Sequence, residues 1–335
     1  YVQRALQDSD PNIRLVGLRS AARFGHPLIP VLEVLIDDPS SSVRRECAVT
    51  LRRLPNDLVP ALWSRLAARF DGEDRWYLEA LGIGAEGRWD ECLNAFLKPG
   101  ADSTYSDLAV RRILWRSRSA ATPRHLAGML SSPDLGEGEV PSLLRAFDFQ
   151  PESDEKTRQL LGLLESETLA GGPSSRDTIR YEVLTRLAET SVGNEPGFRD
   201  MVTELGSSLS NPSLKVALIK RFELREMRED LMELAYSLGE EAIGQDAVRT
   251  LFELGEADGI VEELERTEAR AERLVSLVAK SGHRDAVVGL MSVLKNEQHS
   301  QAVRETALRG LIEGGQGAEA VLDLARSGQF PSDLI

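Results

Sequence analysis

A short pattern recurs along almost the whole chain, and this internal repetition constrains the fold more strongly than any other feature of the sequence. The segments DPNIRLVGLRSAARFG (10–25) and DPSSSVRRECAVTLRRL (38–54) both open with Asp-Pro and continue with an aliphatic residue followed by arginine. The arginines of these pairs, Arg14 and Arg44, lie 30 residues apart. Weaker copies recur at 178–189, 212–222, 246–255 and 301–315, with Arg180, Lys215, Arg249 and Arg304 as the basic residue. A repeat of this length typically holds one pair of helices.

Segments of a second kind lie between these copies and carry apolar residues at the 3.6-residue spacing of a helix. They cover 27–37, 57–70, 154–166, 227–239 and 283–295. Gly25, Gly282 and Gly314 follow expected helix ends, where a left-handed cap favours glycine. The alternation typical of strands is almost absent. Because one helical hairpin cannot bury its apolar stripe alone, we predict an all-α fold, an α-solenoid (superhelix) of about ten helical hairpins.

The chain has 335 residues, more than one ordinary compact core holds. The repeats predict a single solenoid over 1–335, with less regular repeats around 98–175, where insertions blur the register. The first residues, YVQRALQDSD, resemble the tail of a helix, so we expect a piece excised from a longer multidomain protein. No stretch approaches the roughly 20 apolar residues of a membrane span, and no span is predicted.

The pattern of Asp-Pro, aliphatic-Arg and small residues resembles HEAT repeats of the short kind, which are also seen in bilin-lyase-like proteins. Two stretches, 74–97 and 321–335, are similar to the helical region of large planctomycete-type exported proteins. Those proteins combine a sugar-dehydrogenase-like propeller, a HEAT-type segment and a c-type haem domain. This chain lacks a C-x-x-C-H motif, so no haem ligand is carried over. The resemblance implies a connecting segment and a periplasmic or exported location.

Residues 82–87, GIGAEG, match the string G-x-G-x-x-G, which binds dinucleotides when a strand precedes it and a helix follows it. The residues before this string have the apolar spacing of a helix instead. We therefore interpret Gly82, Gly84 and Gly87 as glycines that end one helix and turn into the next, and we predict no NAD or FAD.

No residues show the spacing of a catalytic or metal site. The four histidines, His26, His125, His283 and His299, have no Cys, His or carboxylate at ligand spacing, and we interpret them as capping or surface residues. The two cysteines, Cys47 and Cys92, lie in helical apolar patterns and are predicted to be buried. We predict no catalytic, cofactor-binding or metal-binding residue, no cofactor, and a protein that is not an enzyme.

The net charge of −14 argues against general nucleic-acid binding. One segment, RRILWRSRSAATPR (111–124), is nevertheless strongly basic and contains no acid. Arginine binds carboxylates and phosphates through paired hydrogen bonds and stacks on aromatic rings, so this segment is a candidate docking patch for an acidic partner or a phosphate. In the alternative interpretation, Ile113 and Leu114 are buried and the arginines pair with neighbouring repeats. The candidate docking residues are Arg111, Arg112, Trp115, Arg116, Arg118 and Arg124.

These features favour a non-catalytic interaction or spacer solenoid within a multidomain exported protein. Its expected partner is another protein or the neighbouring domains of the same chain, with no nucleic acid. The alternative is a HEAT-like enzyme that acts on a bulky ligand, as a bilin lyase or a DNA glycosylase does. The glycosylase version needs a basic groove lined by aromatic residues, and its only support is the slightly basic N-terminal third with Trp76, Tyr105 and Trp115.

Overall fold

The computed structural model describes residues 1–97, 107–239 and 241–334. These residues form 21 α-helices and short 3-10 helices, and no strand occurs among them, which confirms the predicted all-α solenoid class. No helix in the described part of the chain has the length and apolar character needed to cross a bilayer. The structure divides into two compact units, Tyr1–Thr190 and Ser191–Ile335, each described by itself below. The extent of a single solenoid over 1–335 stays a prediction.

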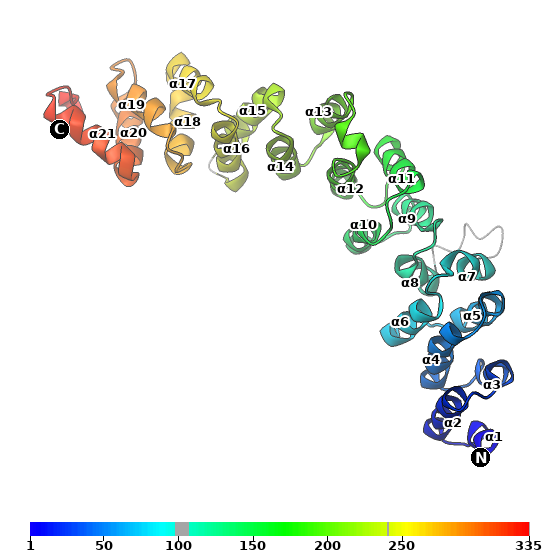
Figure 1. The fold of residues 1–335 in the computed structure, drawn as a ribbon. Coiled ribbons are helices and arrows are strands. Elements are labelled where there is room, and N and C mark those ends of the chain that lie inside the picture. Colours follow the sequence, from blue (N-terminus) through cyan, green and yellow to red (C-terminus); the bar gives the residue numbers. More distant parts are fainter. Residues whose placement is uncertain (98–106, 240, 335) are drawn as a thin grey trace. The chain divides into compact units, whose positions relative to one another are not determined.

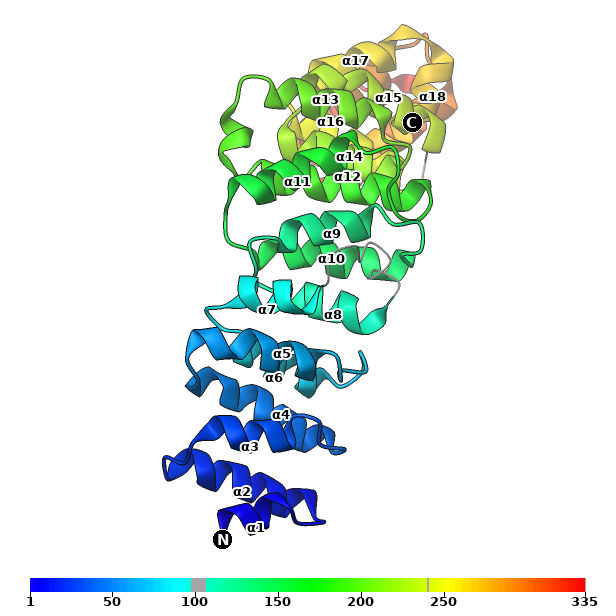
Figure 2. The ribbon, with the colours of Figure 1, turned by 90° about the vertical axis from the view of Figure 1, so that its right-hand side faces the viewer.

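In the first unit (unit 1), the even-numbered and odd-numbered helices form two rows (Figures 1 and 2), and successive even-numbered helices pack against each other. The even-numbered helices are α2 (Pro11–Arg23), α4 (Ser41–Thr50, continued by the 3-10 turn η1, Leu51–Arg53), α6 (Arg75–Gly84), α8 (Leu108–Arg116), α10 (Val140–Asp148) and α12 (Pro173–Leu187). The odd-numbered helices are α1 (Val2–Leu6), α3 (Leu28–Leu35), α5 (Val59–Ala67), α7 (Trp89–Phe96), α9 (Thr122–Leu130) and α11 (Asp154–Glu165), and the remaining 3-10 turns are η2 (Asn56–Leu58) and η4 (Glu137–Glu139).

Within the second unit (unit 2), the even-numbered helices α14, α16, α18 and α20 pack successively. Its helices are α13 (Phe198–Ser208), α14 (Pro212–Phe222), α15 (Arg228–Leu238), α16 (Ala242–Glu253), α17 (Ala257–Arg266), α18 (Glu268–Lys280), α19 (Ala286–Lys295), α20 (Gln301–Glu313) and α21 (Gly315–Arg326), with 3-10 turns η5 (Ser191–Asn194), η6 (Arg225–Met227) and η7 (Ser332–Leu334). All five helices expected from apolar spacing are present as α3, α5, α11, α15 and α19.

A polar side chain that caps the first turn explains where several even-numbered helices begin, namely α2, α6, α8, α14, α18 and α20. The Asp10 carboxylate accepts a hydrogen bond from the Asn12 N–H at 2.8 Å, and Pro11 occupies the first helical position, where a missing N–H leaves no bond unmade. The second Asp-Pro is not equivalent, because Ser40 is the N-cap of α4 and Asp38 lies two residues before it. The repeats therefore align through their arginines, 30 residues apart, and not through their Asp-Pro pairs.

The core of unit 1 is mainly aliphatic and includes an aromatic cluster around Trp63. Trp63 is fully buried, and its indole N–H donates to the Leu81 carbonyl at 2.8 Å. Its ring meets Trp89 and Phe96 edge to face at centroid distances of 5.8 and 6.0 Å. These contacts join α5, α6 and α7, so a side chain of one repeat is fixed by the next.

The structure corrects part of our interpretation of the glycine string at residues 82–87. The residues before it form the helix α6, which agrees with the expected helix and not with the strand of a dinucleotide fold. Gly82 lies within the last turn of this helix and Gly84 is its last residue, and neighbouring repeats approach both positions closely. Only Gly87, with φ of +75°, makes the turn.

Of the three glycines expected to form left-handed caps at helix ends, two do so and one does not. Gly25 and Gly282 have φ of +70° and +64°, as left-handed caps require. Gly314 does follow the end of α20 as its C-cap, but the expected left-handed conformation is wrong: its φ is −100°, and it is also the N-cap of α21. The helix that begins directly after Gly314 takes the place of the expected turn.

Candidate interaction surface

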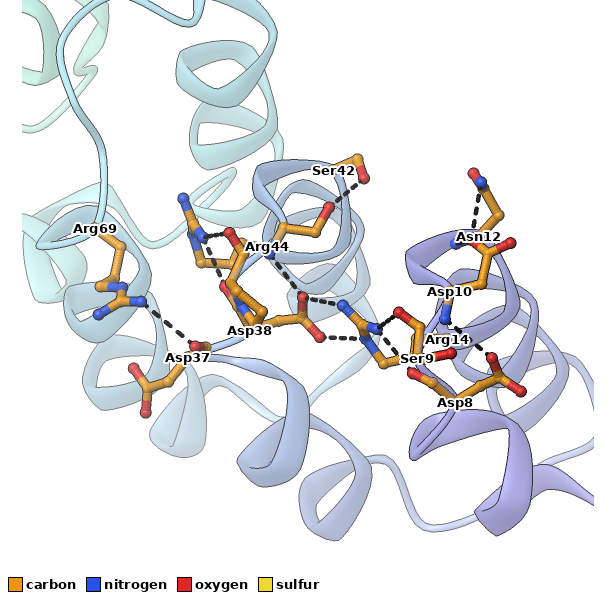
Figure 3. Close-up of polar contacts among 12 residues, drawn as sticks. Asp8, Ser9, Asp10, Asn12, Arg14, Asp37, Asp38, Ser42, Arg44 and Arg69 are labelled. Carbon is orange, nitrogen blue, oxygen red and sulfur yellow. Dashed lines mark hydrogen bonds and ion pairs between the residues drawn. The ribbon is translucent and has the colours of Figure 1, made fainter.

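The basic residue that opens the repeats is a structural contact within the solenoid. In unit 1, the Arg14 guanidinium donates to both carboxylate oxygens of Asp38, at 2.7 and 2.8 Å, and to the carbonyls of Asp8 and Ser9 (Figure 3). Arg44 repeats the arrangement with the carbonyls of Asp38 and Pro39 (Figure 3). These arginines therefore hold the loop before their own helix to the neighbouring repeat.

The same position recurs four residues after the N-cap of other even-numbered helices. In unit 2, Lys215 contacts the Ser207 carbonyl and Asp230, and Arg304 donates to the Leu294 carbonyl at 3.1 Å and pairs with Asp333. The sequence register fails at Arg180 and Arg249, which lie eight residues after their N-caps and are not equivalent to these cations. Residue type and spacing alone did not show which helical turn carried the cation.

Charge is unevenly divided between the two rows of unit 1. The even-numbered helices α2 to α12, with η1, carry fifteen arginines, five carboxylates and no lysine. We call this set of helices the basic row. The odd-numbered helices α1 to α11 carry five basic and six acidic residues. A chain of net charge −14 therefore presents one row with a large excess of arginine.

Ion pairs link the successive helices of the basic row. Arg116 contacts Glu79 at 2.9 Å across α8 and α6, and each side chain is partly exposed. The remaining pairs are Arg19–Glu46 at 2.7 Å, Arg45–Asp74 at 3.5 Å, Arg111–Glu139 at 3.4 Å and Arg186–Asp148 at 2.8 Å. Three of these carboxylates, Glu46, Glu79 and Asp148, belong to the basic row, so three of its five carboxylates are engaged between repeats.

In the candidate docking segment, 111–124, some side chains contact other parts of unit 1 and others are exposed. Arg111 and Arg116 belong to the ion pairs above, and the Trp115 indole N–H donates to the Ser142 carbonyl at 3.1 Å. Arg118 lies 5.3 Å above the Phe149 ring. Burial, and then the charge of Arg116, lowers the pKa of Arg118. Ile113 and Leu114 are fully buried in the manner that the alternative interpretation expects.

Two arginines of this segment, Arg112 and Arg124, are exposed. Arg112 lies on α8 in the basic row, whereas Arg124 lies on α9 in the opposite row. The segment therefore does not form one patch on one row of helices. Its role in docking stays a proposal, and Arg112 is the member best placed for it.

The spacing of the tryptophans in the sequence did not show which of them are exposed and which are buried. Trp89 is 8 % exposed, whereas Trp76, at the start of α6, is 71 % exposed in the basic row beside the exposed Arg75. Tyr105, the third aromatic residue considered with Trp76 and Trp115, lies outside the described residues. The sequence holds no signal that separates Trp76 from Trp89, because Trp89 likewise lies at the start of a helix, directly after the N-cap Arg88, and is buried.

The histidines and carboxylates form no recognisable metal site: among the described residues, no group of three or more His, Cys, Asp or Glu side chains is placed to hold an ion. The histidines were interpreted as capping or surface residues, but His299 is buried. Its Nδ1 lies 2.7 Å from Glu268, whose other oxygen accepts the Ser300 N–H. This contact joins α18 to the N-cap of α20.

The two thiols are predicted to be unreactive in the folded protein. Cys47 and Cys92 are fully buried, and burial raises the pKa of each thiol to about 12. With an aromatic disulfide reagent at pH 8, we expect both thiols to react only as fast as unit 1 unfolds, and immediately in denaturant. Rapid reaction of either thiol in native buffer would contradict this prediction.

Comparison with known proteins assigns part of the chain to a repeat family. Residues 2–82 match the family model for HEAT repeats, so this part of the chain is a HEAT-repeat region. No curated protein matches the chain. The crystal structure of an engineered protein aligns over 98 % of this chain and 91 % of its own with 17 % identity and a TM-score of 0.29, too low to support a conclusion.

Proposed function

We propose that the protein is a non-catalytic interaction module whose basic row in unit 1 docks an acidic partner. HEAT repeats generally mediate protein interactions or scaffolding, and residues 2–82 match that family. The observation that supports the proposal most directly is the fifteen arginines against five carboxylates in one row of helices. Arginine provides paired donors that fit carboxylates.

The wider setting that we propose is a multidomain exported protein, in which this segment connects domains and binds either one of them or a separate protein. The support is the similarity of 74–97 and 321–335 to the helical region of planctomycete-type exported proteins. The sequence of the full-length gene tests this setting. A propeller or a c-type haem domain encoded beside this segment is the expected result, and its absence would contradict the proposal.

One observation favours the alternative, an enzyme of the HEAT-like type that acts on a bulky ligand. Trp76 is exposed in the basic row, as a nucleic-acid-binding surface would require. Trp115, the other aromatic residue invoked, is held by the Ser142 carbonyl instead. Tight binding of a DNA duplex with a damaged base, followed by base release, would establish this alternative in place of the interaction module.

Binding of a dye-labelled oligo-glutamate peptide tests the docking proposal. We expect binding that weakens steeply with salt, because exposed charges are screened over about 8 Å at physiological ionic strength. Arg112→Glu is expected to weaken it, and Arg124→Glu, an equal change of charge in the opposite row, is the control. An equal effect of both substitutions, or no binding at low salt, would contradict the proposal.

The stability of two arginine variants separates surface from structure within α8. Arg112→Glu is expected to change the free energy of unfolding by less than about 0.5 kcal/mol, because Arg112 is exposed. Arg116→Glu is expected to lose about 1–2 kcal/mol, since it places a second carboxylate beside Glu79 and removes the guanidinium that packs on Gly82. Urea unfolding measures both values, and equal stabilities would contradict the assignment of Arg116 to structure.

A further inference from the structure

The exposed side chains of α6 and α8 lie in a common register. A Cβ on Gly72, before α6, would meet Leu108 at the start of α8, and a Cβ on Gly82 would meet Arg116 at its end. The two helices therefore run in the same direction, and Arg116 pairs with Glu79 across them. One helical turn rises about 5.4 Å, so residues three or four positions earlier lie one turn below this pair on the same faces.

That turn carries Arg75 and Trp76 on α6 and Arg112 on α8, all three exposed. Arg75 and Arg112 form no ion pair with another described residue, whereas Asp74, the N-cap of α6, and Glu79, within α6, already pair with Arg45 and Arg116. Two arginines with unused donors thus flank the most exposed tryptophan of the chain.

From this arrangement we propose that Arg75, Trp76 and Arg112 form the anchor of an acidic peptide segment that carries an apolar side chain. The peptide's carboxylates pair with the two guanidinium groups, and its apolar side chain covers the indole. The inference rests on the proposed function and specifies its partner. An exposed tryptophan between charged residues is the composition from which binding hot spots are built.

Charge favours a short acidic peptide over a nucleic acid. Residues 1–190 carry 24 Lys and Arg against 28 Asp and Glu, so the arginine excess is confined to one row of a unit that is acidic as a whole. A long polyanion that extends beyond the row meets like charge, whereas a short segment does not. Arginine forms paired hydrogen bonds with carboxylates and phosphates alike, so the distribution of charge, and not the type of cation, decides between the two ligands.

Two dye-labelled peptides test the anchor on the intact chain: oligo-glutamate, and the same peptide with one central phenylalanine. We expect the phenylalanine peptide to bind about tenfold more tightly and to shift the tryptophan emission to shorter wavelength. Trp76→Ala is expected to remove this advantage, and Arg75→Glu to weaken both peptides. Arg124→Glu is the control of equal charge, and all substituted side chains are exposed, so the melting temperature is expected to stay unchanged.

The outcomes separate the anchor from the docking proposal. If Arg112→Glu weakens oligo-glutamate but Trp76→Ala leaves the phenylalanine peptide unaffected, the basic row docks acids and the anchor is overturned. If neither substitution matters, both proposals are overturned. Preferential binding of a single-stranded oligonucleotide at equal salt, or a dimer that Trp76→Ala dissociates, would replace the peptide by a nucleic acid or a second copy and would overturn the anchor.

Discussion

Replacement of Asp38 by alanine is expected to destabilise unit 1 by about 3 kcal/mol, because it leaves the largely buried cation of Arg14 without its counter-charge. The side chains of Arg14 and Asp38 are 11 % and 4 % exposed, and two hydrogen bonds join them. Asp38 also accepts the Ser40 N–H at 2.8 Å, at the N-cap of α4. The substitution therefore removes a bidentate ion pair and a contact that positions the next helix.

Asp37→Ala is the matched control, one residue earlier. Asp37 pairs with Arg65, but these side chains are 54 % and 47 % exposed, and surface pairs contribute about 0–1 kcal/mol. The four tryptophans, residues 63, 76, 89 and 115, all lie in unit 1, so fluorescence in urea follows the unfolding of this unit. Equal losses for the two variants would show that the burial of the Arg14–Asp38 pair carries no extra stability.

The contribution of Asp38 is expected to vanish in acid. Burial by itself raises the pKa of Asp38, but the hydrogen bonds from Arg14 and the Ser40 N–H and the nearby arginine charges outweigh it and hold that pKa below its ordinary value. A carboxyl with a lowered folded-state pKa stabilises the protein fully above its unfolded pKa of about 3.9, and loses this contribution as the pH falls through the folded value. The stability difference from Asp38→Ala should therefore be constant near neutrality and shrink below about pH 4.

Gly84→Ala is expected to destabilise unit 1 by about 1–3 kcal/mol, although alanine is the better helix former. A Cβ at Gly84 would lie 2.5 Å from the carbonyl oxygen of Ala48, so the backbones of α6 and α4 would have to separate. At Gly82 the added atom meets the flexible end of Arg116 instead, at 2.7 Å. The loss for Gly82→Ala should therefore be smaller.

Gly162→Ala is the control for helix propensity, because Gly162 lies within α11 with nothing within 4 Å of an added Cβ. This variant is expected to gain about 0.5–1 kcal/mol. Urea unfolding followed by tryptophan fluorescence measures all three. If Gly84→Ala stabilises the protein as Gly162→Ala does, Gly84 is a simple helix residue and the close approach of α4 and α6 plays no part.

The periodic features of the fold were accessible from the sequence because they depend on neighbours within one or two helical turns. Apolar spacing predicted α3, α5, α11, α15 and α19, and the 30-residue interval between Arg14 and Arg44 predicted equivalent positions in two repeats. The register was lost at Arg180 and Arg249, where the helix starts two turns before the basic residue. A repeat defined by spacing does not fix the N-cap, which a side-chain contact decides.

The sequence by itself determined that the chain is all-α and repetitive, since helix periodicity and the need to stack hairpins are properties of local pattern. Only the tertiary structure decided which side chains are exposed and which are buried or paired. Trp76 and Trp89 look alike in sequence, yet one is exposed and the other buried, and of two arginines one turn apart, Arg116 reaches Glu79 while Arg112 stays exposed. Each distinction depends on a partner in the adjacent repeat, about 30 residues away, whose position follows from how the helices pack and not from the order of residues within one helix.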